Sequence, residues 1–89
     1  MSRNVLNWLC GELEVDKAEL LSNRRHGWLV AKRRIAVCFF WELGKGYSET
    51  ARILNRDHTS IMHLYRTASN KDKDTAVFLA ERWVFINGE

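Results

Sequence analysis

The sequence has 89 residues, of which 46% are hydrophobic and 11% aromatic, and its formal net charge is +3. This length holds one domain with one modest core and excludes a large multi-step enzyme, while the apolar content excludes a disordered tail. Proline is absent and glycine is rare, so turns of a β-rich fold are scarce and we expect one all-α domain over residues 1–89.

The N-terminal part is expected to form two short helices. Apolar residues recur at helical spacing over Val5–Leu13, with Asn4 or Ser2 as the N-cap. Asp16 is the expected N-cap of a further helical turn, with Glu19 in the capping-box position.

Positive charge is concentrated in the next segment, which we expect to face an anion. No acidic residue lies between Glu19 and Glu42, whereas five basic ones do: Arg24, Arg25, Lys32, Arg33 and Arg34. Residues 24–28 contain a glycine and lack periodicity, which predicts a basic loop. The helix expected over residues 29–43 is apolar on nearly every side beyond its first turn, which predicts a buried central helix. Trp41 is therefore assigned to the core, rather than to a stacking platform for single strands.

Residues 47–67 predict two short helices joined by a tight turn, which is the pattern of a helix-turn-helix. The first is expected over residues 47–55 with Ser48 as its cap, and the second over residues 57–67. On pattern alone this is weak evidence, because any helical hairpin resembles it.

A polar hinge is expected over residues 69–74, before a final helix over about residues 75–85. The C-terminal helical segment as a whole spans residues 72–86. This helix either closes the core or offers a surface for self-association or for contact with a replication protein.

The start of the second helix carries the chemistry of recognition, because in this motif it reaches base edges in the major groove. Asp57 can accept from a cytosine amino group, Thr59 can offer its methyl group to thymine, and His58 can donate to a purine. The free amides of a helix N-terminus suit phosphate. The alternative is that Asp57 only caps the helix and His58 is only solvated.

Three separated motifs resemble the C-terminal DNA-binding domain of the bacterial replication initiator DnaA. Residues 56–63, Arg-Asp-His-Thr-Ser-Ile-Met-His, followed by Arg66, are similar to the signature of that family, an Arg-Asp-His-Thr-Thr run before an apolar pair and a His. Residues 20–25 resemble the entry into the basic loop of the family, residues 31–34 the start of its long helix, and residues 42–43 the end of that helix.

The resemblance spans residues 5–67 and implies a Trp-repressor-like helical fold that binds double-stranded DNA as a monomer. It implies that Arg25, or its neighbour Arg24, enters the minor groove. It implies base contacts in the major groove from Asp57, His58 and Thr59. The resemblance and the basic patch together predict which residues contact the DNA backbone: Arg24, Lys32, Arg33, Arg34, Arg56, Ser60, His63 and Arg66.

Several functions are set aside by what the sequence lacks. It has no phosphate loop of the form GxxxxGK[ST], so no nucleotide and no cofactor are expected. His58 and His63 are five residues apart, off the spacing that joins two ligands on one helix face, and no metal site is expected. Cys10 and Cys38 lie among apolar residues, which predicts buried thiols without a disulfide. No membrane span or apolar leader is expected, which indicates a cytoplasmic, nucleoid-associated protein.

The sequence therefore predicts a stand-alone, non-enzymatic protein that prefers certain DNA sequences and regulates replication initiation or transcription, as a phage or mobile element would encode. Its target site is not carried over from the family, because Trp28 lengthens the loop, Asn55 replaces a glycine pair, and Trp41 stands at a commonly basic position. The alternative hypothesis is an adaptor of the replication machinery that binds a protein through its Trp-rich last helix.

Overall fold

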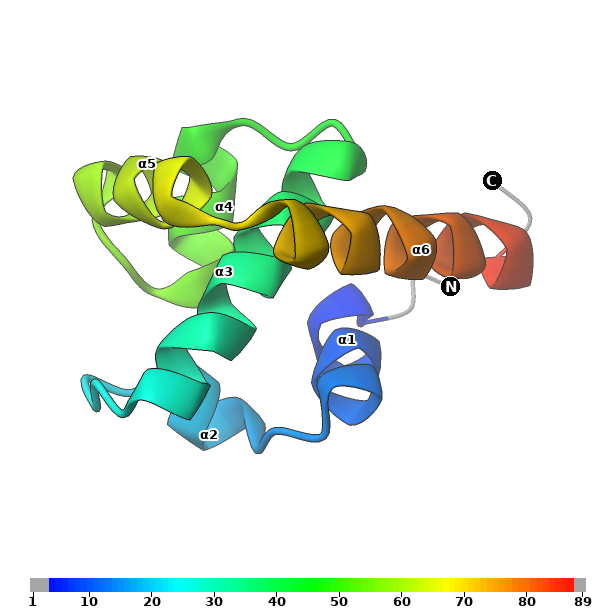
Figure 1. Cartoon of the computed structure of the whole chain (residues 1–89). Coiled ribbons are helices and arrows are strands. Elements are labelled where there is room, and N and C mark those ends of the chain that lie inside the picture. Colours follow the sequence, from blue (N-terminus) through cyan, green and yellow to red (C-terminus); the bar gives the residue numbers. More distant parts are fainter. Residues whose placement is uncertain (1–3, 88–89) are drawn as a thin grey trace.

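A computed structural model describes residues 4–87, which form six helices and no strand (Figure 1), confirming the all-α expectation. The helices are α1 (Val5–Leu13), α2 (Lys17–Leu20), α3 (Gly27–Glu42), α4 (Tyr47–Leu54), α5 (His58–Thr67) and α6 (Asn70–Asn87). None of these helices combines the length and the apolar composition needed to cross a membrane.

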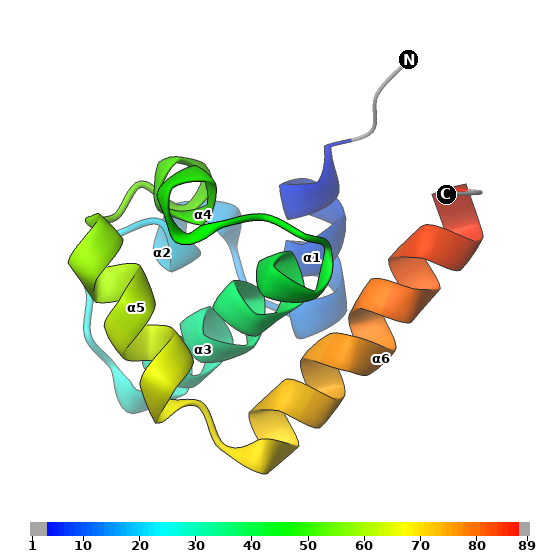
Figure 2. The same ribbon diagram turned by 90° about the horizontal axis from the view of Figure 1, so that it is seen from above.

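Helix α3 is the central element, and the other helices surround it in both views (Figures 1 and 2). It packs against α2, α4, α5 and α6. Its apolar residues explain this position, because Phe39 and Phe40 are fully buried and their rings meet edge to face at 5.2 Å. Helix α6 lies along α3 and seals the core with Trp83, whose ring is 5.3 Å from that of Trp8 on α1. The last helix thus closes the core, as one of the two hypotheses held.

The observed N-caps of the helices agree in part with those that the sequence predicts. Asn4 caps α1, since its Oδ1 accepts the Asn7 amide at 3.1 Å, and Ser2 lies outside the described residues. Asp16 precedes α2, but its side chain makes no capping bond. The cap of α4 was wrongly assigned to Ser48: Gly46 is the N-cap, one residue before Tyr47, so the helix begins as expected but without a side-chain cap.

The hinge expected over residues 69–74 was wrong, because α6 begins at Asn70. Ser69 and Asp72 form a reciprocal capping box: Ser69 Oγ accepts the Asp72 amide at 3.0 Å, and Asp72 Oδ2 accepts the Ser69 amide at 3.0 Å. Because of this cap, the first turn of α6 is helical although its side chains are polar and no apolar residue recurs there at helical spacing.

Both cysteines are buried and free. Burial raises the pKa of the Cys10 thiol above its usual value, and it raises that of Cys38 to about 11. Both thiols are therefore protonated near neutral pH and behave as small apolar side chains.

Candidate nucleic-acid interface

Arg33 is a buried structural residue, which corrects its assignment as a contact to the DNA backbone. Its side chain is 4% exposed, and its guanidinium donates only to carbonyls of the preceding segment. Nε donates to Leu20 at 2.9 Å, while the terminal nitrogens donate to Glu19 at 3.1 Å, to Ser22 at 2.8 Å and to Arg24. These bonds fix the end of α2 and the loop after it to α3, because one side chain of α3 donates to four carbonyls of that segment.

Arg56, in the turn of the helix-turn-helix, joins that same loop. One of its terminal nitrogens donates to the Ser22 carbonyl, which also accepts from Arg33. The Arg56 Nε is buried without a hydrogen-bond partner. Burial, and then the charge of Arg25, lowers the pKa of Arg56, and burial followed by the charge of Arg56 lowers that of Arg33. The Arg56 guanidinium thus lies close enough to those of Arg25 and Arg33 to be repelled by each, a repulsion that an anion would relieve.

The start of α5 is open for contact with a ligand. Asp57 is its N-cap residue, yet the carboxylate makes no capping bond. The first helical hydrogen bond runs from the Ile61 amide to the Asp57 carbonyl at 3.1 Å, so the amides of residues 58–60 precede the helical ladder. Asp57, Thr59 and Ser60 are all exposed. The side chain of Asp57 is therefore free for a partner outside the chain.

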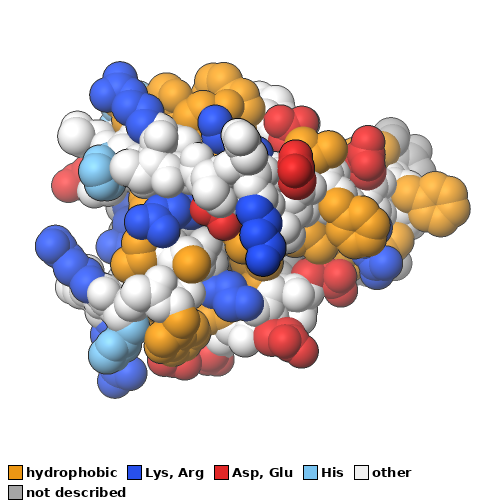
Figure 3. Space-filling model, in the orientation of Figure 1, with side chains coloured by type: hydrophobic (Ala, Val, Ile, Leu, Met, Phe, Trp, Pro, Cys, Tyr) orange, Lys and Arg blue, Asp and Glu red, His pale blue; other side chains and the backbone are white. Residues whose placement is uncertain are grey.

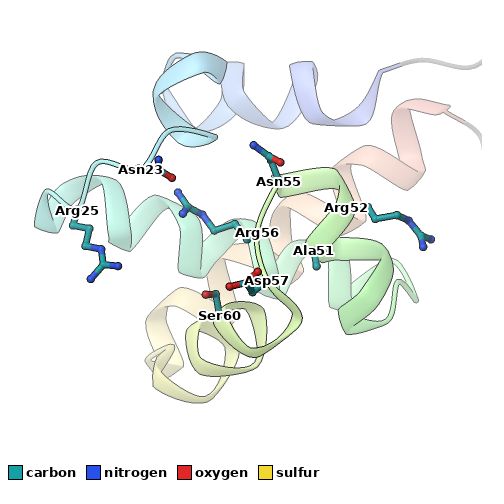
Figure 4. A pocket seen from close by; sticks show the side chains of 8 residues that line it. All are labelled: Asn23, Arg25, Ala51, Arg52, Asn55, Arg56, Asp57 and Ser60. Carbon is teal, nitrogen blue, oxygen red and sulfur yellow. The ribbon is translucent and has the colours of Figure 1, made fainter.

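Two adjacent hollows bring the basic loop and the start of α5 together. The first lies between the loop and the helix-turn-helix, and Figure 4 shows Arg25 hanging from the loop, Arg56 reaching toward Asn23, and Asp57 beside Ser60. It is lined by Asn23, Arg25, Ala51, Arg52, Asn55, Arg56, Asp57 and Ser60. The second is lined by Arg25, Val30, Arg33, Arg56, Thr59, Ser60, His63 and Leu64. Arg25, Arg56 and Ser60 line both hollows. Asp57, in the first hollow, is the single acidic residue that lines either of them.

The remaining basic residues predicted at the site lie around these hollows rather than in them. Arg24 is exposed and pairs with Glu19 at 3.6 Å, which favours Arg25 as the residue free to enter a groove. Arg34 donates through Nε to Thr67 Oγ1 at 3.3 Å, so it is held against the last turn of α5. Lys32 is half-buried and Arg66 is exposed at the end of α5. Figure 3 shows many of the blue side chains over this end of the molecule.

His58 lies on a different side of the α5 start, in an aromatic cluster. Its ring meets Tyr47 edge to face at 5.7 Å, and Tyr47 stacks on Trp41 at 5.1 Å. Trp41 also lies 5.0 Å from Tyr65 and is 41% exposed, so its assignment to the core was wrong. Trp41 lies in the last turn of α3, and the rings of Tyr47 and Tyr65 both lie against its indole. His58 is exposed and lines neither hollow, and the cluster lies against one side of its ring.

Three polar residues of the first hollow were missed by the sequence argument: Asn23, Arg52 and Asn55. Arg52 carried a signal, because it lies four residues before Arg56 at the end of a short helix. Asn55 carried another, because asparagine tolerates the left-handed conformation that ends α4, where its φ is 55°. No group of three His, Cys, Asp or Glu side chains that suits a metal ion occurs in residues 4–87.

These features define a helix-turn-helix domain of the kind that binds nucleic acid, with a basic loop fixed beside the second helix of the motif. Comparison with family models gives a match to the bacterial DnaA protein helix-turn-helix over residues 2–67. The chain belongs to this family, and the resemblance seen in its sequence is confirmed. The comparisons with curated proteins and with solved structures gave no match. The match ends before α6.

Proposed function

We propose that the chain binds double-stranded DNA with sequence preference and regulates replication initiation or transcription at the sites it occupies. Membership of a DNA-binding helix-turn-helix family supports the general part of this function. The observation that carries the specific part is that Arg25 of the loop lines both hollows, the first together with Asp57 and Ser60 and the second together with Thr59 and Ser60.

The proposed docking places the start of α5 in the major groove and Arg25 in the adjacent minor groove. Asp57 accepts from a base amino group, because a carboxylate repels phosphates and is unused by the helix. Thr59 and His58 provide the other base contacts. Charged and polar side chains on either side hold the DNA backbone. The charged ones are Arg24, Lys32, Arg34 and Arg66, and the polar ones are Ser60 and His63. Arg56 acts from within, by keeping the loop beside α5.

Selection from a random duplex library, followed by fluorescence anisotropy with the selected and a shuffled duplex, tests this function. Asp57→Asn and Thr59→Ala should lower discrimination between the two duplexes by about 1–3 kcal/mol for each lost contact. Arg34→Ala should weaken both duplexes alike and reduce the salt dependence, because each phosphate contact adds about 0.9 to the slope of log affinity against log salt.

Lys71→Ala is the matched control, since it removes one positive charge from an exposed position at the start of α6, outside the two hollows. It should leave discrimination unchanged. The proposal is wrong if no sequence is enriched, or if the substitutions at Asp57 and Thr59 affect the two duplexes equally.

A further inference from the structure

His58 differs from the other proposed base readers in what surrounds it. Asp57 lines the first hollow and Thr59 the second, whereas His58 lines neither. It is the first residue of α5, its side chain is exposed, and its imidazole forms no hydrogen bond or ion pair in the described part of the chain. An exposed side chain without such bonds moves among several staggered rotamers unless packing selects one. What packs against the imidazole therefore decides how His58 meets a base pair.

The ring that packs against the imidazole is that of Tyr47, the first residue of α4. The two ring centroids lie 5.7 Å apart and the ring planes cross at 86°, which is an edge-to-face arrangement. Aromatic pairs favour this geometry, and the gain is a factor of about 2 to 12 in an equilibrium. Applied to the imidazole, this factor is the advantage of the orientation that contacts Tyr47 over the orientations that leave it.

Tyr47 is in turn fixed by the other rings of the aromatic cluster, which consists of Trp41, Tyr47 and Tyr65. Its ring stacks on the indole of Trp41 at the end of α3, with the centroids 5.1 Å apart and 29° between the planes. Tyr65 of α5 lies 6.2 Å from Tyr47 and 5.0 Å from Trp41, so each ring of the cluster contacts the other two. Lys73 of α6 lies over the Tyr65 ring at 5.2 Å. Residues of four helices thus hold the surface on which the imidazole packs.

We infer that Tyr47 is a positioning residue for base readout, which holds the His58 imidazole in one orientation and so sets the preference at the base pair that His58 contacts. This role rests on the proposed function, because it requires α5 to enter the major groove. The affinity of a group whose competent orientation is only partly populated falls by the populated fraction. The duplex with the preferred base pair is weakened by this loss, whereas a duplex altered at that base pair has no contact with His58 to lose. Removing the Tyr47 ring should therefore lower discrimination at one base pair by about 2- to 12-fold.

Fluorescence anisotropy with the selected duplex, and with duplexes that each carry one base-pair change, tests this role. The base pair that His58 reads is the one at which His58→Ala loses discrimination. Tyr47→Leu should lose discrimination at that same base pair and keep it at the base pair that Asp57→Asn affects. In the His58→Ala background Tyr47→Leu should have no further effect there, because the side chain that it positions is already absent.

Two matched variants separate positioning from other roles of Tyr47. Tyr47→Phe keeps the ring and removes the hydroxyl group, so it should discriminate as the wild type does, unless the hydroxyl itself contacts DNA. Tyr65→Leu removes a ring of the same cluster that does not pair with the imidazole. It should keep discrimination at the base pair that His58 reads, because Tyr47 still stacks on Trp41. Circular dichroism checks that each variant is folded.

NMR of the wild-type complex gives a test that needs no variant. Nuclear Overhauser effects between the rings of His58 and Tyr47 should be present in the free chain and persist on the selected duplex. The positioning role is overturned if they vanish on binding, if Tyr47→Leu keeps full discrimination at the base pair that His58 reads, or if Tyr47→Phe loses as much as Tyr47→Leu. It is also overturned if His58→Ala affects no base pair. The proposed function survives each of these results, and it fails instead if the selection enriches no sequence.

Discussion

Replacing Arg33 by methionine should sharply destabilise the fold, although the sequence places this residue in a basic patch. Methionine matches the length and apolar stem of arginine but removes every donor. The carbonyls of Leu20 and Arg24 then lose the Arg33 bond with no side chain to replace it, whereas those of Glu19 and Ser22 keep bonds from Ser22 and Arg56. Each hydrogen bond to a charged group contributes about 1.5–3 kcal/mol, but the substitution also removes the desolvation cost of a buried charge. The net loss is therefore about 3–5 kcal/mol, because each buried carbonyl that is left without a partner costs about 1–3 kcal/mol.

Such a loss is a large part of the total stability, since a domain of this size unfolds with about 5–12 kcal/mol. The melting temperature should fall by about 12–40 °C, at roughly 4–8 °C for each kcal/mol. Thermal and urea unfolding followed by circular dichroism measure the effect. Arg33→Lys should lose about half as much, because one ammonium group cannot reach all four carbonyls.

Lys32→Met is the matched control, because this neighbouring residue has no hydrogen bond or ion pair of its side chain within residues 4–87. It should change stability by less than about 0.5 kcal/mol. A structural role for Arg33 is refuted if the free energy of unfolding of Arg33→Met lies within about 1 kcal/mol of the wild-type value while its affinity for DNA falls, as a surface phosphate contact would require.

Three further predictions concern stability. Burial raises the pKa of Cys38 to about 11. Between about pH 8.5 and 11 the folded chain therefore keeps a proton that the unfolded chain releases. The free energy of unfolding should fall across this range by up to about 1.4 kcal/mol per pH unit. Urea midpoints should show a flatter alkaline decline in Cys38→Ala; equal slopes would contradict this. Glu14 ends α1 with a φ of 55°, so Glu14→Gly should stabilise by about 0.5–1 kcal/mol and Glu14→Ala should not. Ser69→Ala should cost about 1 kcal/mol by removing the cap of α6, and an unchanged urea midpoint would show the cap to be dispensable.

The sequence predicted the helix-turn-helix well, because its signals are local. The apolar residues of α4 and α5 recur at helical spacing, and Asn55 marks the left-handed turn between them. The start of α6 was missed, because its first turns carry only polar side chains and the sequence argument depended on apolar periodicity. The reciprocal bonds of Ser69 and Asp72 were visible as a spacing of three residues, but the segment was assigned to a hinge.

The role of Arg33 was missed for a different reason. Charge patterning counts basic residues without showing which way they face. Helical spacing held the necessary signal, since Leu29, Arg33, Ala36 and Phe40 follow one another at intervals of three and four residues, and all four are buried. The four carbonyl partners of Arg33 come from α2 and the loop that follows it, however, and only the folded chain brings them together.

The arginines of this surface divide into Arg33 and Arg56, which hold the loop, and those that the proposed function assigns to DNA. Arg33 and Arg56 share the Ser22 carbonyl, so the loop is tied to α3 and to the helix-turn-helix at one point. Arg25, three residues further on, is thereby held beside the start of α5 before any ligand arrives. A loop that is already ordered loses less conformational entropy on binding, so more of the contact energy appears as affinity. Replacing an arginine that holds the loop should therefore weaken DNA binding through disorder of Arg25 as well as through lost charge.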